Sequence, residues 1–315
     1  MEFFERILNT PCTAGYTQNM TSVLKDELSS LFDKTEENVL GGISFTKNLS
    51  PDGFHLMLAA GIDTAGLAAT YVDKSKVSVA PLGAFNTQSM AFSRVTFEKG
   101  QTGVLTPQND GELPGELSSY NVEIYDEKEA QGVTLGDVAY FDEKIHNKNG
   151  YYTGFGSGAK MCICFLSKLV KELMNNTNFV KELGVGTLSA AFLGQNALGS
   201  RGASVEAYNL CPDKVINICP YDLSEKNVGK SDLSDSVFVK VSDAASVSDE
   251  EVNLLCEKLL DSFGISHTRR VSGKDRSALS RLTLTKQGAK GSEICLGVNY
   301  IGTRGETAKY PFTNC

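Results

Sequence analysis

LMLAAGIDTAG, from Leu56 to Gly66, is the stretch of sequence that decides the fold. Its first five residues form a continuous apolar run, and Gly61, Ile62 and Asp63 follow as a tight turn. An apolar run bounded by turn residues is typical of a parallel strand that is covered on both faces. Because ligands in open α/β sheets bind beyond the carboxyl ends of such strands, the turn stands where a functional site is expected.

The composition indicates a globular chain that does not act on membranes or nucleic acids. Its 315 residues, of which 41% are hydrophobic, suffice for two domains or one large one. A formal net charge of -8 disfavours nucleic acid and anionic membrane surfaces as partners. No apolar run reaches the ~18 residues of a membrane helix. The acidic, amphipathic start MEFFERILNT is unlike a signal peptide.

The 8 cysteines predict free thiols in a reducing compartment. They show no paired spacing, and Cys162, Cys164 and Cys256 lie in apolar runs. Disulfide frameworks are typical of short secreted chains with regularly spaced cysteines. We therefore expect a cytoplasmic protein.

Outside residues 67–150, helical and strand patterns alternate. The expected helices are Glu2 to Leu8, Gln18 to Phe32, Ala159 to Asn175, a short helix ending at Asn209, one from a capping box at Ser248 to Phe263, and Lys274 to Lys286. The expected strands, besides the one ending at Gly61, are 43–45, 187–193, 214–218, 237–241 and 294–298. This alternation predicts an α/β fold with a mixed sheet sandwiched by helices.

Residues 67 to 142 have a different pattern. Short alternating runs rich in Val, Tyr, Phe and Thr are broken by Gly, Pro or Asn, which predicts a small all-β domain. The acidic segment from Asn109 to Ser119 is expected to be a surface loop. We therefore divide the chain into an α/β domain of residues 1–66 and 151–315, and an inserted β domain of residues 67–150.

Several of these motifs resemble those of one peptidase family. Gly61-Ile62-Asp63-Thr64-Ala65-Gly66 is similar to His-x-Asp-Glu-x-Gly, a strand end of the tetrahedral (TET-type, FrvX-like) dinuclear-zinc aminopeptidases, metallopeptidase family forty-two. Gly199-Ser200-Arg201-Gly202-Ala203 resembles the end of that family's Glu-Glu-x-Gly-x-x-Gly-Ala motif. The likeness extends over nearly the whole chain. It implies a zinc-exopeptidase-like, phosphorylase/hydrolase-like fold whose inserted β domain acts as a lid and takes part in dimerisation.

The resemblance also implies where two zinc ions would bind, and this chain lacks the ligands there. The positions that the family fills with two histidines and four carboxylic acids are here Gly61, Gly156, Gln195, Asn196, Cys219 and Arg304. Glycine supplies no ligand, and an amide cannot act as a general base at neutral pH. An arginine ~4 Å from a divalent ion would add roughly 8 kcal/mol of repulsion at an effective dielectric constant of about 20. We therefore expect no metal cofactor.

Other residues are not expected to replace these ligands. His55 lies on the same strand ~20 Å before Gly61, while His146 lies in a polar loop and His267 follows a helix end. All three histidines are interpreted as surface or cap residues. Cys219 ends a strand near the site, and a small buried thiol is favoured there over a ligand or a nucleophile.

Asp63 is the family active-site residue that this chain keeps. In the family this aspartate orients a metal-bound histidine, so without the histidine Asp63 is interpreted as a turn or helix-capping carboxylate. Asp275 matches a family Gly-Thr-Asp-Ala turn and is expected to cap the last helix. The glycine-rich loop 199–202 precedes a helix and could bind an anion there, although it lacks Walker or dinucleotide spacing.

Three functions fit this pattern. We favour an aminopeptidase-like pseudoenzyme, a structural or regulatory subunit of a homo-oligomer or of a mixed oligomer with active paralogues. The second is an active metallo-aminopeptidase with two zinc ions that removes N-terminal residues from peptides. The third binds a peptide or small anion in the same pocket through Arg201, Lys160 and Arg304, because basic side chains suit carboxylates and phosphates.

Overall fold

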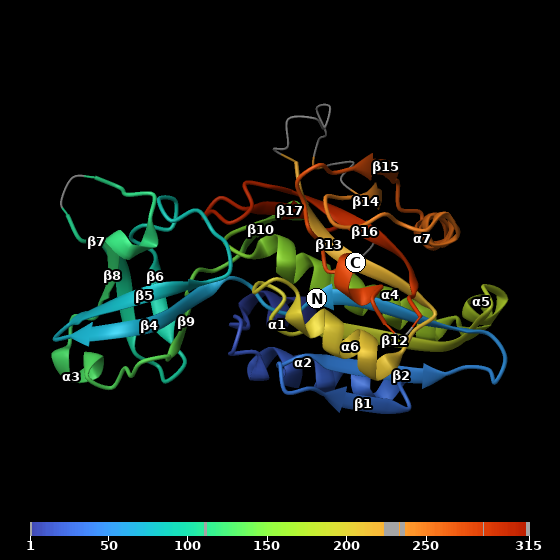
Figure 1. Ribbon diagram of the computed structural model, residues 1–315, viewed down its shortest axis with the longest axis horizontal. Helices are drawn as coiled ribbons and strands as arrows, with labels where there is room; N and C mark the ends of the chain where they lie inside the picture. Colours follow the sequence, from blue (N-terminus) through green and yellow to red (C-terminus); the bar gives the residue numbers. More distant parts are fainter. Residues whose placement is uncertain (1, 110–111, 224–232, 234–236, 286, 313–315) are drawn as a thin grey trace.

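A wide sheet flanked by helices forms one part of the molecule, and a closed barrel forms the other (Figure 1). The computed structural model describes residues 2–109, 112–223, 233, 237–285 and 287–312. Among these residues, no helix combines the length and apolar character that crossing a membrane requires. The predicted α/β fold with a small all-β part is confirmed.

The large sheet is mixed, with a parallel centre and antiparallel edges. In the described part of the chain its order is β1-β2-β12-β3-β13-β16-β17-β11-β10, and β14 and β15 branch from β16. β3 lies between β12 and β13 and is parallel to both, while β16 is parallel to β13. The bounds are β1 Lys34–Glu37, β2 Ile43–Asn48, β3 Phe54–Gly61, β10 His146–Lys148, β11 Tyr151–Thr153, β12 Val185–Leu193, β13 Lys214–Asp222, β14 Val237–Ser242, β15 Thr268–Val271, β16 Lys290–Asn299 and β17 Thr307–Lys309.

Both faces of β3 are buried, which explains its unbroken apolar run. Successive side chains of a strand point to opposite faces of the sheet. Leu56, Leu58 and Ala60 belong to the larger core cluster, whereas Met57 and Ala59 belong to a second cluster. The prediction of a parallel strand covered on both faces is therefore confirmed.

Helices supply the other half of each cluster. The larger cluster takes apolar side chains from α1 Glu2–Asn9, α2 Gln18–Leu28, α4 Ser157–Asn175, α5 Thr177–Glu182 and α7 Glu250–Ser262. The second cluster takes them from α6 Arg201–Leu210 and α8 Leu279–Leu282. The sheet is therefore sandwiched by helices, and α4 contacts β3, β13 and β16 directly.

The inserted strands close into a barrel in the order β4-β5-β8-β7-β6-β9, around a core of its own. Its strands are β4 Gly66–Asp73, β5 Lys76–Leu82, β6 Arg94–Phe97, β7 Thr102–Pro107, β8 Tyr120–Glu123 and β9 Val138–Phe141, joined partly through the short helices η2 Leu117–Ser119 and α3 Glu127–Ala130. β10 already pairs with β11 in the large sheet. The chain thus re-enters that sheet before residue 150, where we expected the insertion to end. The role of the barrel as a lid or dimerisation domain stays a prediction.

The predicted helix over Lys274 to Lys286 is wrong except for α8, and residue 286 lies outside the described residues. In the turn that precedes α8, the Ser277 N–H donates to Asp243 Oδ2 at 3.0 Å. Side-chain acceptors of this kind hold backbone groups outside a helix. Asp275 does not cap α8, which has no side-chain cap.

The predicted capping box at Ser248 is also corrected. Asp249 caps α7, because its Oδ1 accepts hydrogen bonds from the N–H groups of Glu251 at 3.0 Å and Val252 at 3.3 Å. The Ser248 hydroxyl instead donates to the Lys240 carbonyl at 2.7 Å. A carboxylate caps a helix as well as a hydroxyl does, so Ser248 is left to fasten the segment before the helix to β14.

Near the N-terminus two details differ from expectation. The helix predicted to reach Phe32 ends at Leu28 and continues as a 3₁₀ helix, η1 Ser29–Leu31. β1 was not predicted, because Lys34–Glu37 is a charged, largely exposed edge strand without an apolar face. Of the predicted surface loop from Asn109 to Ser119, residues 110 and 111 lie outside the described part, and Leu117–Ser119 forms η2.

Candidate functional site

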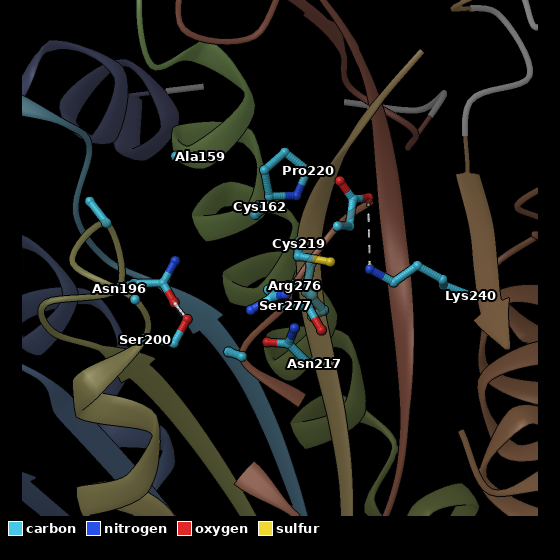
Figure 2. Close-up of a pocket in the computed structure, with 16 residues that line it drawn as sticks. Ala159, Cys162, Asn196, Ser200, Asn217, Cys219, Pro220, Lys240, Arg276 and Ser277 are labelled. Atoms are coloured by element: carbon cyan, nitrogen blue, oxygen red, sulfur yellow. Dashed lines mark hydrogen bonds and ion pairs between the residues drawn. The ribbon is translucent and has the colours of Figure 1, made fainter. Parts of the chain in front are cut away.

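A cavity of about 320 Å³ lies at the carboxyl ends of β3 and β13, where the sequence predicted a functional site (Figure 2). Among the predicted site residues, Gly61, Asn196 and Cys219 line it together. The remaining walls come from the start of α4, the β12–α6 loop, β14 and the segment before α8. The other lining residues are Ala159, Cys162, Ala197, Gly199, Ser200, Asn217, Ile218, Pro220, Lys240, Asp275, Arg276, Ser277 and Ala278.

The side chain of Asn196 lies against the backbone of Gly61. A Cβ atom on Gly61 would be 2.3 Å from Asn196 Nδ2 and 2.7 Å from its Cγ. Asn196 Oδ1 accepts a hydrogen bond from the Ser200 hydroxyl at 3.0 Å, which holds the amide in place (Figure 2). A side chain at position 61 therefore has no room unless Asn196 moves.

Asp63 lies beside this loop but does not line the cavity. Its Oδ1 accepts a hydrogen bond from the Ala197 N–H at 3.1 Å, and the residue is only 3% exposed. Burial raises the pKa of Asp63 to about 7, although hydrogen bonds from nearby backbone N–H groups act to lower it. Asp63 thus fastens the loop that carries Asn196.

Gly156 occupies the residue before α4 in a left-handed conformation, with φ of 76°. A Cβ atom there would lie 2.7 Å from Thr64 Cγ2, so this position also faces the end of β3. The carboxylate at the start of α4 comes instead from Glu306, which accepts hydrogen bonds from the N–H groups of Gly158 at 2.7 Å and Gly302 at 2.9 Å. Burial raises the pKa of Glu306. Glu306 was not predicted, since Gly-Glu-Thr after a polar turn carries no distinctive signal.

Gln195 and Asn196 face different cavities. Gln195 has a left-handed backbone, with φ of 49°, and lines a separate cavity of about 210 Å³ with Thr17 and Asn38. Asn196 lines the main cavity. The two amide side chains at the predicted base and ligand positions therefore do not line the same cavity.

The basic residues expected to bind an anion do not meet in one place. The Lys160 ammonium is buried and donates to the Leu8 carbonyl at 2.6 Å, and burial lowers its pKa to about 8. Arg304 pairs with Glu143 at 2.7 Å beside another cavity, of about 650 Å³. Arg201 is exposed at the start of α6. The predicted grouping of these three residues is therefore wrong.

Lys240 and Arg276, which the sequence analysis missed, bring positive charge to the main cavity. Lys240 points from β14 toward the cavity and is only 2% exposed (Figure 2). Its Nζ lies 2.8 Å from Glu293 Oε2 and 3.4 Å from Asp243 Oδ2. The signal was present, because a lysine inside the apolar strand VFVKVS is rarely buried without carboxylate partners.

The residues at the predicted ligand positions do not fit a pair of zinc ions, which bind carboxylate, imidazole and thiolate groups. Gly61, Gly156 and Asn196 supply none of these groups, and Arg304 pairs elsewhere. The histidines do not compensate within the described chain. His55, for example, shares a hydrogen bond with the Ser189 hydroxyl at 2.8 Å.

Helices on both faces of a mixed sheet, a barrel inserted after β3 and a cavity at the strand ends define an aminopeptidase-like protein. A model of the M42 glutamyl aminopeptidase family matches residues 41–311, and the chain belongs to this family. No curated protein matches the sequence.

Solved structures share the fold at low sequence identity. An aminopeptidase from the archaeon Desulfurococcus kamchatkensis superposes with a TM-score of 0.87 at 18% identity, over 98% of this chain and 90% of that one. The TET aminopeptidase of a marine-sediment Thaumarchaeota archaeon superposes with a TM-score of 0.85 at 16% identity, over 98% of this chain and 91% of that one. The TET1 peptidase of Pyrococcus horikoshii superposes with a TM-score of 0.83 at 19% identity, over 98% of this chain and 94% of that one. The family predicted from the sequence is confirmed.

Proposed function

We propose that this chain is an M42-family pseudoenzyme that binds no zinc pair, cleaves no peptide bond and serves as a structural or regulatory subunit of an oligomer. The observation that carries the proposal is the contact between Gly61 and Asn196, in which an amide fills the space of the first metal-binding side chain.

The chemistry of peptide hydrolysis supports this proposal. A metallo-aminopeptidase needs a metal-activated water and a group that accepts its proton. Gln195 and Asn196 carry amides, which do not accept a proton at neutral pH. The carboxylates of Asp63 and Glu306 are buried outside the cavity lining, where each accepts a hydrogen bond from a backbone N–H group. Among the described residues that line the cavity, the carboxylate is that of Asp275, which lies 4.0 Å from Lys240 Nζ and at none of the family's base or ligand positions.

An oligomer is supported by the assemblies of related structures. The TET1 peptidase of Pyrococcus horikoshii can assemble into a tetrahedron or a large octahedral shell. We propose that this chain forms a homo-oligomer or enters a mixed oligomer with active paralogues. The 7 described cysteines are free thiols, which fits the cytoplasmic location that we propose.

Metal content and turnover test the proposed loss of activity. The purified protein is incubated with Zn²⁺ or Co²⁺, its bound metal is counted, and leucine and glutamate p-nitroanilides are supplied. We expect no turnover and fewer than two ions per chain. A Gln195→Ala/Asn196→Ala variant controls for contaminating peptidases. Two ions per chain, together with turnover that this variant abolishes, would establish the active metallo-aminopeptidase instead.

Sedimentation and co-purification test the proposed assembly. Two differently tagged copies expressed together should co-purify and sediment as one large particle. An active paralogue from the same cell should co-purify when the oligomer is mixed. A monomer at micromolar concentration that captures neither would contradict a subunit role.

A second candidate function is the binding of a peptide or small anion. The basic side chains of Lys240 and Arg276, which line the main cavity, favour it. The residues predicted for this role, Arg201, Lys160 and Arg304, do not line that cavity. A thermal-shift screen with phosphate, single amino acids and dipeptides tests it. Stabilisation that Arg276→Ala removes and Arg281→Ala retains would support binding in the cavity, and a flat screen would end this candidate.

A further inference from the structure

Three side chains with metal-binding atoms converge beside the main cavity. Cys219 on β13 and Cys295 on β16 are paired residues of adjacent parallel strands, and their Sγ atoms lie 3.5 Å apart. Glu293 lies two residues before Cys295 and therefore faces the same side of the sheet. Its Oε1 is 3.6 Å from Cys219 Sγ. Among the described residues, these form the one group of at least three His, Cys, Asp or Glu side chains whose ligand atoms lie within 4.8 Å of one another.

The spacing matches the ligand shell of one tetrahedral zinc ion. With Zn–S bonds of ~2.3 Å and Zn–O bonds of ~2.1 Å, tetrahedral angles place two sulfurs about 3.8 Å apart and a sulfur and an oxygen about 3.6 Å apart. The observed separations are 3.5 Å between the sulfurs and 3.6 Å between Cys219 Sγ and Glu293 Oε1. Side-chain movements of a few tenths of an ångström are enough to close this shell.

The neighbours of Glu293 hold it in place as outer-shell residues do. Asn217 Nδ2 donates to its Oε1 at 2.6 Å, and Lys240 Nζ lies 2.8 Å from its Oε2. Hydrogen bonds to a ligating carboxylate orient it and tune its affinity for the metal.

The charge of the buried cluster also suits one dication. When Zn²⁺ enters and both thiols release their protons, the net charge of the cluster does not change. The ammonium of Lys240 remains between the carboxylates of Glu293 and Asp243, so the exchange of two protons for a dication leaves this ion-pair cluster as it was. The ion therefore adds no uncompensated charge to this part of the core.

Access comes from the cavity. Cys219 is partly exposed and lines the cavity, whereas Glu293 and Cys295 are buried behind it. An ion held by these three residues would leave its fourth position toward the cavity, for water or another small ligand. Open sites of this kind have three protein ligands and one exchangeable ligand.

We propose that Cys219, Glu293 and Cys295 form a mononuclear zinc site in which two thiolates and one carboxylate bind the metal. Of the family's six ligand positions, only that of Cys219 is shared. The site therefore does not require the other five positions, and Glu293 and Cys295 are not among them.

Titration of the fully reduced protein with Co²⁺ tests the site, because thiolate–cobalt charge transfer gives an absorption band that carboxylate or imidazole ligands do not produce. We expect one cobalt per chain, displaced by one equivalent of Zn²⁺. Cys219→Ser and Cys295→Ser should each weaken binding at least tenfold and remove the band. Asn217→Ala should weaken it about 10- to 100-fold and keep the band, as loss of an outer-shell residue does.

Cys256→Ser is the matched control, since it removes a buried thiol from α7 in the larger core cluster. It should leave the cobalt titration unchanged. If Cys295→Ser does not fold, the partly exposed Cys219 carries the test.

Three results would overturn the proposal: no thiolate–cobalt band, an unchanged affinity in both cysteine variants, or a Cys219–Cys295 disulfide that forms in air and persists with excess zinc. Two ions per chain that bind independently of Cys295 would contradict both this site and the proposed loss of the zinc pair. One ion lost with Cys295, in a protein that still hydrolyses p-nitroanilides, would contradict only the proposed function.

Discussion

Asn196 fills the space into which a side chain on Gly61 would project, with its Nδ2 2.3 Å from the position of a Cβ atom on the glycine. Two residues far apart in the chain thus constrain each other's size. At the end of β3 the family motif has a histidine, and this chain combines a glycine with a neighbouring amide. A single substitution back to histidine would meet that amide.

We predict that Gly61→Ala lowers the free energy of unfolding by about 1 to 3 kcal/mol, because the added methyl group overpacks the contact with Asn196. Asn196→Ala in the same chain should recover most of this loss. Urea unfolding of wild type, both single variants and the double variant measures the coupling between the two positions. Additive effects of the two substitutions would show that they do not compete for space.

We predict that stability falls between about pH 4 and pH 7 through Asp63. The folded pKa of about 7 exceeds the value of ~3.9 for an exposed aspartate, so the folded state keeps a proton that the unfolded state has lost. This contribution falls by up to about 1.4 kcal/mol per pH unit in that window and is constant above it. Asp63→Asn does not titrate and should lack this slope. Unfolding both proteins at pH 5, 6, 7 and 8 checks the difference, and parallel curves would contradict it.

We predict that Glu306→Ala destabilises the chain more than Glu306→Gln. The carboxylate accepts hydrogen bonds from the buried N–H groups of Gly158 and Gly302, and alanine leaves both donors without an acceptor. Glutamine keeps one acceptor, and each orphaned buried donor costs about 1 to 3 kcal/mol. Thermal melts of the two variants provide the measurement. Equal melting temperatures would indicate that water replaces the carboxylate.

We predict that Arg304→Ala changes stability by no more than about 1 kcal/mol, because its side chain is half exposed. Arg304 and its partner Glu143 both line the cavity of about 650 Å³ and not the main cavity. Binding of cobalt at Cys219 should not change. Glu143→Ala is the matched control for the ion pair. A change in the cobalt spectrum on loss of Arg304 would place this residue at the main cavity after all.

Local pattern and family resemblance predicted the fold well, because they depend on short-range sequence. The apolar run of β3 and the alternation of helices and strands were readable directly, as was the change to short β runs at residue 67. The turns before α8 could not be predicted in this way, because they are held by acceptors such as Asp243, which is distant in sequence.

The site was predictable only in part, because chain position does not fix side-chain direction. The resemblance correctly placed Asn196 and Cys219 at the cavity. It did not predict that Gln195 faces a different cavity. It also gave no indication that β14 would pair antiparallel with β16, which sets Lys240 opposite Glu293. Pairings of this kind depend on strand register across the whole sheet.

The short turn between β3 and β4 joins the barrel to the strand whose end lines the cavity. Only residues 62–65 separate the two strands, and the Ile62 N–H donates to the Leu193 carbonyl at 3.0 Å while the Thr64 N–H donates to the Cys12 carbonyl at 3.0 Å. These bonds fix the start of the barrel directly beside Gly61, which lines the cavity.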